Sequence, residues 1–219
     1  MKNILSLNYE EAKSFLLKHK SYINIDLPPY FIFDSLLDEI SNDILKRKNF
    51  TNIKKSNPDN LENVNYKLFH NKNGQYDWRQ FELIHPFLYV SLVHEITKYN
   101  NWKLIKKRFG EIRAKSIVEC MSLPIVSETD KSDKAEQILN WWEQIEQKSL
   151  VLNLDYRYVY HTDITDCYGS IYTHSIPWAI HNREFAKENK KDKKLIGNII
   201  DFHIQNMSNG QTNGIPQGS

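Results

Sequence analysis

Cysteine is scarce in this chain, which has only Cys120 and Cys167 among its 219 residues. Two thiols exclude the dense disulfide framework of a small secreted scaffold. They are also too far apart in the sequence to form the short-spaced pair of a structural zinc site. We therefore expect a protein of a reducing compartment, the cytoplasm.

Long hydrophobic runs are missing as well. No stretch approaches the ~18 apolar residues of a membrane helix, and Lys2, Glu10 and Glu11 put charges where a secretory signal would be apolar. Glycine and proline number only seven each, which excludes collagen-like and low-complexity chains. The 40% of hydrophobic residues is enough for a packed core, in one large domain or two small ones. We expect no membrane partner.

A strong excess of one charge is also lacking, since 29 basic residues face 27 acidic ones. Locally the balance differs, because residues 102–115 contain six basic residues and one acid, and residues 183–194 contain six and three. Such runs bind phosphates in some proteins and are simply solvated faces in others. The candidate nucleic-acid-binding residues are Lys106, Lys107, Arg108, Lys190 and Lys191.

Helical patterns dominate the chain. Asn8 and Glu11 form a possible capping box for a helix over residues 9–20, and apolar spacing predicts a second helix over residues 33–44. Pro86 suits the first position of a third helix, followed by a shorter one that carries the basic run at 102–115. Apolar residues from Ala135 to Ile145 predict a helix with a core-facing side. The last predicted helix has its inner face from Ile196 to Met207 and ends at Asn209-Gly210.

Two segments have strand patterns. Residues 66–84 hold two aromatic-rich runs on either side of Asn73-Gly74, which predicts a β-hairpin with its tip there. Residues 154–164 are rich in tyrosine and β-branched residues and predict a central strand.

Asp163 lies at the end of that predicted strand, where a carboxylate can face a metal ion. Nucleotidyl transfer commonly uses two Mg²⁺ ions held by carboxylates of neighbouring strands. The alternative is that Asp163 caps the helix that follows, a common position for aspartate. Five histidines (His85, His94, His161, His174 and His181) lack zinc-site spacing, so we expect them to be packed or on the surface.

The segment D-I-T-D-C-Y, residues 163–168, resembles the first palm motif of reverse transcriptases. The resemblance implies that Asp163 is a catalytic metal ligand, that Ile164 binds metal through its carbonyl, and that Asp166 contacts the nucleotide. Tyr168 falls on the steric-gate position, which excludes a 2′-hydroxyl and so selects deoxynucleotides. The alternative for Tyr168 is an aromatic ring packed in the core.

Two more segments resemble the same family, in the family's order. N-G-I-P-Q-G-S at residues 213–219 is similar to the second palm motif, which implies nucleotide contacts from Pro216, Gln217 and Gly218. K-N-G-Q-Y-D-W-R at residues 72–79 resembles the fingers hairpin, which implies that Lys72 and Arg79 bind the triphosphate. S-I-Y-T-H-S-I-P-W-A-I-H and W-R-Q-F-E-L-I-H-P-F look like the bacterial abortive-infection and defence-associated group, which implies a role in phage defence.

The resemblance implies a mainly helical α+β fold, with the fingers β-hairpin and an incomplete palm sheet of a right-hand polymerase. The expected division is an N-terminal helical extension (1–60), fingers (61–150) and a partial palm (151–219). The implied activity is RNA-directed DNA synthesis from dNTP on an RNA or DNA template-primer, with two Mg²⁺ ions or with Mn²⁺. No Y-x-D-D, the family's other carboxylate motif, occurs in the chain, so we expect an amino-terminal portion that is inactive alone.

Two other functions remain open at this stage. One is a non-catalytic nucleic-acid-binding module derived from a reverse transcriptase. The other is a palm polymerase that makes RNA, which a steric gate at Tyr168 argues against.

Overall fold

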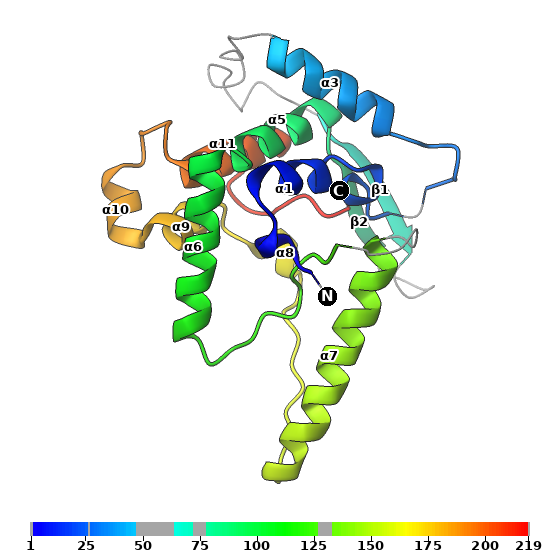
Figure 1. Ribbon diagram of the computed structural model, residues 1–219, viewed down its shortest axis with the longest axis vertical. Helices are drawn as coiled ribbons and strands as arrows, with labels where there is room; N and C mark the ends of the chain where they lie inside the picture. The colour runs from blue at the N-terminus through cyan, green and yellow to red at the C-terminus, as the bar shows by residue number, and fades with distance from the viewer. Residues whose placement is uncertain (1, 26, 47–63, 72–77, 127–132, 219) are drawn as a thin grey trace.

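The computed structural model describes residues 2–25, 27–46, 64–71, 78–126 and 133–218, and within them the fold is mainly helical α+β (Figure 1). This confirms the expected class. None of the helices in these ranges is long and apolar enough to cross a membrane. The elements are η1 (Ile4–Ser6), α1 (Tyr9–Leu16), α2 (His19–Tyr22), α3 (Asp34–Lys46), β1 (Tyr66–Asn71), β2 (Trp78–Leu83), α5 (Pro86–Ile96), α6 (Tyr99–Lys115), α7 (Asp133–Asp155), α8 (Cys167–Ser170), α9 (Ser175–His181), α10 (Arg183–Glu188) and α11 (Ile196–Met207).

The first helix begins where the capping pattern predicted. The Asn8 side chain accepts hydrogen bonds from the backbone N–H groups of Glu10 and Glu11, and Glu11 accepts one from the Asn8 N–H. The helix ends at Leu16, because Lys18 is extended and α2 starts separately at His19. The Asp34 carboxylate accepts from the His19 N–H at 2.8 Å, so a distant side chain caps α2 and the single predicted helix is two.

The middle helices follow their sequence signals with one difference. α3 covers most of the predicted second helix, and Pro86 occupies the first turn of α5, where the His85 ring accepts from the Phe87 N–H. The helix with the basic run was predicted to be the shorter one, which is wrong. α6 has 17 residues against 11 in α5, because the helix starts at Tyr99 and continues through Gly110, where nothing crowds the backbone.

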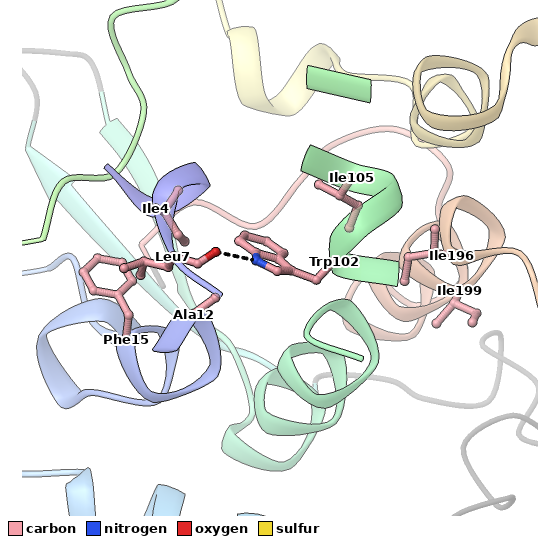
Figure 2. Close-up of a cluster of buried hydrophobic side chains, with 8 residues drawn as sticks. All are labelled: Ile4, Leu7, Ala12, Phe15, Trp102, Ile105, Ile196 and Ile199. Carbon is pink, nitrogen blue, oxygen red and sulfur yellow. Dashed lines mark hydrogen bonds between the residues drawn. The ribbon is translucent and has the colours of Figure 1, made fainter. Parts of the chain in front are cut away.

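The largest core cluster joins the beginning, middle and end of the chain (Figure 2). Trp102 of α6 is 5% exposed and packs between the η1–α1 segment and α11. Its indole N–H donates to the Leu7 carbonyl at 3.1 Å. The buried members are Ile4, Leu7, Ala12, Phe15, Trp102, Ile105, Ile196 and Ile199. The cluster includes residues from all three expected domains, whose division stays a prediction.

Two smaller clusters attach α3 and the hairpin to α5. Tyr22, fully buried, packs with Leu37 and Val90, and its hydroxyl donates to the carbonyl of Ile84, just after β2. Ile84 in turn packs with Leu88 of α5 and Met207 of α11. The end of β2 is therefore held against α2, α5 and α11.

The hairpin is confirmed as a two-stranded antiparallel sheet. β1 pairs with β2 from Tyr66 opposite Leu83 to Asn71 opposite Trp78. The predicted tip at Asn73-Gly74 lies outside the described residues.

The strand predicted over residues 154–164 is wrong. α7 continues to Asp155, and residues 156–163 have no regular structure and are exposed. A strand needs a neighbour for its backbone N–H and C=O groups. Among the described residues the only sheet is β1–β2, so this segment has no strand beside it.

The core-facing side predicted for α7 is also wrong. Ile138, Leu139 and Trp142 are 48%, 56% and 58% exposed, because α7 points away from the body of the molecule (Figure 1). The carboxyl-terminal helix is confirmed, since Ile196, Ile199, Ile204 and Met207 are buried. Asn209 and Gly210 follow it with φ of 53° and 74°, the left-handed geometry of a helix end.

The contact between α9 and α11 gives a test of packing. A Cβ on Gly197 of α11 would lie 2.6 Å from the Pro177 Cα and 2.8 Å from the His181 Cδ2. We expect Gly197→Ala to lower the free energy of unfolding by about 1–3 kcal/mol, because the crowding atom is backbone. In Gly110→Ala, the matched control, the new Cβ meets nothing within 4 Å. Its better helix propensity should raise the same quantity by up to about 1 kcal/mol. Urea unfolding measures the free energy of unfolding of both variants. An equal decrease in the two would contradict the close packing of α9 against Gly197.

Candidate functional site

Three segments that are far apart in the sequence line one cavity of about 510 Å³, which we call the hairpin cavity. Lys67, Gln80 and Glu82 come from the hairpin. Asp166, Tyr168 and Gly169 come from the segment around α8, and residues 207–217 form the remaining wall. The carboxyl-terminal segment, red in Figure 1, runs from α11 back toward β2. Two of these segments overlap the palm-like motifs that resemble reverse transcriptases. The third comes from the hairpin strands on either side of the fingers-like motif, whose described residues, Trp78 and Arg79, are not in the lining.

Backbone hydrogen bonds join the walls. The Glu82 N–H donates to the Gln217 carbonyl at 2.7 Å, and the Ile215 N–H donates to the Tyr168 carbonyl at 2.9 Å. Gly214, with φ of +94°, donates to Ile171. These bonds hold residues 214–217 between β2 and the α8 segment. The path requires left-handed backbone that L side chains rarely adopt, which glycine tolerates.

Asn65 anchors the floor of the cavity. It is 6% exposed, and its side-chain N–H₂ donates to Glu82 Oε2 at 3.1 Å and to the Met207 carbonyl at 2.9 Å. Its Oδ1 accepts from the His85 N–H. Gln80 donates to Glu82 Oε1, so both Glu82 oxygens are engaged. Sequence reasoning missed Asn65, which sat at the end of a polar stretch without periodicity.

Four of the residues implied by the palm motifs line the cavity: Asp166, Tyr168, Pro216 and Gln217. Tyr168 is 52% exposed, so the alternative that its ring is packed in the core is wrong. Gly218 is not in the lining. Its carbonyl accepts from the Asn24 N–H, and its φ of +129° places it against the Glu82 backbone.

Asp166 has an unusual backbone, with φ of 50° and ψ of 47°. Its carboxylate lies over Gly169, where a Cβ would meet the Asp166 Oδ2 at 2.3 Å. Any side chain at Gly169 would displace the carboxylate from the cavity wall. Asp166, and not Asp163, holds the position before α8, so the helix-capping alternative for Asp163 is wrong.

Asp163 and Ile164 lie apart from the cavity, in the exposed segment that follows α7. The Asp163 Oδ1 accepts from the Ile164 N–H at 2.8 Å. Within the described ranges, no three His, Cys, Asp or Glu side chains are grouped so as to hold a metal ion. The described residues therefore do not assemble a site for the expected pair of Mg²⁺ ions.

The basic residues expected on the hairpin are placed differently from each other. Lys72 lies outside the described residues. Arg79 is exposed and lies opposite His70 in the hairpin. Gln80 and Glu82, one and three residues further along β2, line the cavity. Because successive side chains of a strand point to opposite faces, Arg79 is on the far face of the hairpin. Lys67, opposite Glu82, is the described lysine that lines the cavity.

Two residues of the first basic run, Lys106 and Arg108, are hydrogen-bonded to distant parts of the protein. Lys106 donates to the Leu7 carbonyl, and Arg108 donates to the Ala179 carbonyl and to Glu111. The hydrogen bond from Arg108 lowers the pKa of Glu111, with Lys107 adding to the effect at 3.7 Å. These contacts favour a structural role for Lys106 and Arg108. Lys190 and Lys191 are exposed and line a different cavity.

Comparison with known proteins adds no family to these observations. No protein-family model and no curated protein matches the chain. The resemblance to reverse transcriptases therefore rests on the three motifs alone.

The expectation for the histidines agrees with their contacts. His94 is half-buried and shares a 2.8 Å hydrogen bond with Ser41, and burial lowers its pKa to about 4. His181 accepts from the Gly197 N–H, and burial lowers its pKa as well. His161 is exposed. His174 is discussed below because its partner is a carboxylate.

Proposed function

We propose that the chain is the fingers and part of the palm of an RNA-directed DNA polymerase, and that the hairpin cavity receives the deoxynucleotide. One observation carries the proposal: the two palm-like motifs, distant in sequence, meet at one cavity with the strands of the hairpin that holds the third motif. A common ligand explains it.

The cavity lining offers groups that could recognise a nucleotide, but its charges do not favour tight binding of phosphate. The Tyr168 ring supplies an apolar face for the sugar, and amides from Gln80, Gln211, Asn213 and Gln217 offer hydrogen bonds. Lys67 is the cation available for phosphate, and Glu82 and Asp166 carry the opposite charge. We therefore expect weak binding by these residues, with Lys72 as a further phosphate ligand. Arg79, on the far face of the hairpin, is not assigned to this cavity.

In this proposal, β1–β2 is the fingers hairpin and residues 151–219 belong to an incomplete palm sheet. The exposed segment 156–163 would become a strand only beside the strands that the rest of a palm provides. Asp163 would then be brought to the end of that strand as a metal ligand. A role in phage defence follows from the group resemblance and is part of the same proposal.

A second candidate is a non-catalytic module that binds nucleic acid. Asp163 is exposed and belongs to no group of three possible metal ligands in the described ranges, which favours this candidate. The two functions differ in ligand: the polymerase requires a nucleoside triphosphate in the hairpin cavity, and the module does not.

Calorimetric titration of dTTP and UTP into the chain tests the proposal. We expect weak binding with dTTP preferred, because the Tyr168 ring crowds a 2′-hydroxyl. A steric cost of about 1–3 kcal/mol corresponds to roughly 5- to 150-fold in affinity. Tyr168→Ala should remove the preference, and Lys67→Gln should weaken dTTP about ten-fold or more through loss of a charge-assisted hydrogen bond.

The control is Lys46→Gln, which removes the same charge from the exposed end of α3. It should leave the dTTP affinity unchanged. Equal affinities for the two nucleotides before substitution, or equal effects of Lys67→Gln and Lys46→Gln, would refute the cavity as a deoxynucleotide site.

A further inference from the structure

A second cavity, of about 410 Å³, lies between α11 and the loop that precedes it, and we call it the lysine cavity. Lys190, Lys191 and Lys193 line it from the loop, and Ile199, Phe202 and Asp201 line it from α11. His174, just before α9, completes the wall. The two palm-like motifs and the fingers-like motif contribute no residue to this cavity. His174 lies in the S-I-Y-T-H-S-I-P-W-A-I-H segment, and Lys190 and Lys191 are two of the candidate nucleic-acid-binding residues.

A carboxylate and an imidazole form a pair inside it. Asp201 is 8% exposed, and its Oδ2 lies 2.6 Å from the His174 Nδ1. Its Oδ1 accepts from the Gln205 side chain at 2.8 Å. With both oxygens engaged, Asp201 fixes the ring so that Nδ1–H donates inward and Nε2 remains for a ligand. A buried carboxylate costs free energy unless it is paired, and the His174 ring nitrogen and the Gln205 side-chain amide provide that pairing.

The segment between α10 and α11, residues 189–195, which we call the lysine loop, is held in place by α11. The Asn198 side chain donates to the Asn189 carbonyl at 3.0 Å and to the Asp192 carbonyl at 2.8 Å. The Asp192 carboxylate accepts from the Lys194 N–H. The Asp192 carboxylate therefore stabilises the turn of the loop. Lys190 and Lys191 are exposed where they line the cavity. The Lys193 ammonium lies 5.9 Å from the centre of the Phe202 ring.

We propose that the lysine cavity binds a phosphate group of a nucleotide or a nucleic-acid strand. Lys190 and Lys191 supply the charge. The His174 Nε2, on the side of the ring away from Asp201, donates to a phosphate oxygen when the ring carries both protons, and Asp201 orients the ring. Lysine binds phosphate as a point charge, and hydrogen bonds from charged donors are about twice as strong as neutral ones. Phe202 and Ile199 supply an apolar floor suited to a base. The inference does not depend on what the hairpin cavity binds.

The test observes His174 directly. We would record two-bond ¹H–¹⁵N spectra of the histidine rings in the full chain, with His174→Gln to assign its signals. Three probes are added separately: inorganic phosphate, dTMP and a twelve-residue oligothymidylate. We expect the His174 ring signals to shift and saturate. Tighter binding of the oligonucleotide identifies a nucleic-acid strand as the source of the phosphate, and equal affinities identify a small phosphate compound.

Two double variants make the result specific. Lys190→Gln with Lys191→Gln should weaken binding about ten-fold or more, since each lysine removes a charge-assisted contact. The control, Lys20→Gln with Lys46→Gln, removes the same charge elsewhere and should leave the affinity within two-fold, on the order of measurement error. Both pairs are exposed, so folding is preserved. An absence of His174 shifts with all three probes, or equal effects of the two double variants, would overturn the proposal.

Discussion

Purified residues 1–219 are expected to incorporate no deoxynucleotide in a primer-extension assay, with either Mg²⁺ or Mn²⁺. Two-metal catalysis supplies several kcal/mol of charge stabilisation, and each 1.36 kcal/mol is ten-fold in rate. Asp163 is exposed, and no group of three possible metal ligands occurs in the described part of the chain, so a two-ion site is not assembled around it. A loss of at least about 10³-fold relative to a working polymerase follows.

The assay needs a complete reverse transcriptase as positive control on the same template-primer. Templated incorporation by residues 1–219 would contradict the prediction. Asp163→Asn in the same chain would then tell whether Asp163 takes part, because it removes a charge with little change of volume. Nucleotide binding in the hairpin cavity without incorporation is the combination that the proposal requires.

Trp102→Ala is expected to lower the free energy of unfolding by about 3–5 kcal/mol. The indole is the largest side chain of the cluster in Figure 2 and lies between segments from both ends of the chain. The Leu7 carbonyl, its hydrogen-bond partner, also accepts from Lys106 at 2.9 Å and so keeps a donor. The loss is therefore mainly packing, and a thermal melt should show the midpoint roughly 6–20 °C lower.

Trp142→Ala is the matched control. Trp142 is 58% exposed on α7, and removal of an exposed side chain usually changes stability by less than about 0.5 kcal/mol. A similar loss of stability in both variants would contradict the exposed position of Trp142 on α7.

Local signals predicted local structure well. The capping box at Asn8 and Glu11 and the proline that starts α5 each determine a few neighbouring residues through hydrogen bonds or restricted dihedrals. These features need no knowledge of the rest of the fold. The apolar face of α11 was equally readable, because a period of 3.6 residues over twelve residues leaves one buried side.

Features that depend on distant partners were not predicted. The aromatic pattern of residues 154–164 is typical of a strand, but a strand forms only beside another one. The apolar residues of α7 have a helical period, which identifies the side of the helix that could be buried. The period does not show whether another element packs against that side. The break between α1 and α2 depends on Asp34, fifteen residues away.

The candidate site was predicted by residue type more than by geometry. Tyr168, Pro216 and Gln217 line the hairpin cavity as the resemblance implied, whereas Arg79 is on the other face of its strand. Alternation along β2 would have separated Arg79 from Gln80, had the cavity face been known. Asn65 and Lys67 carried no signal, because their importance arises from contacts with Glu82 and Met207.

The bonds that close the hairpin cavity also set the order in which the chain should fold. Asn65 and Met207 are 142 residues apart, and the Gln217 and Gly218 carbonyls accept from the N–H groups of Glu82 and Asn24. Bringing such distant residues together costs loop-closure entropy before any contact repays it, so contacts of this kind form late. In refolding, α1 and the hairpin should acquire structure early, and the capacity to bind a ligand should be the last property to return.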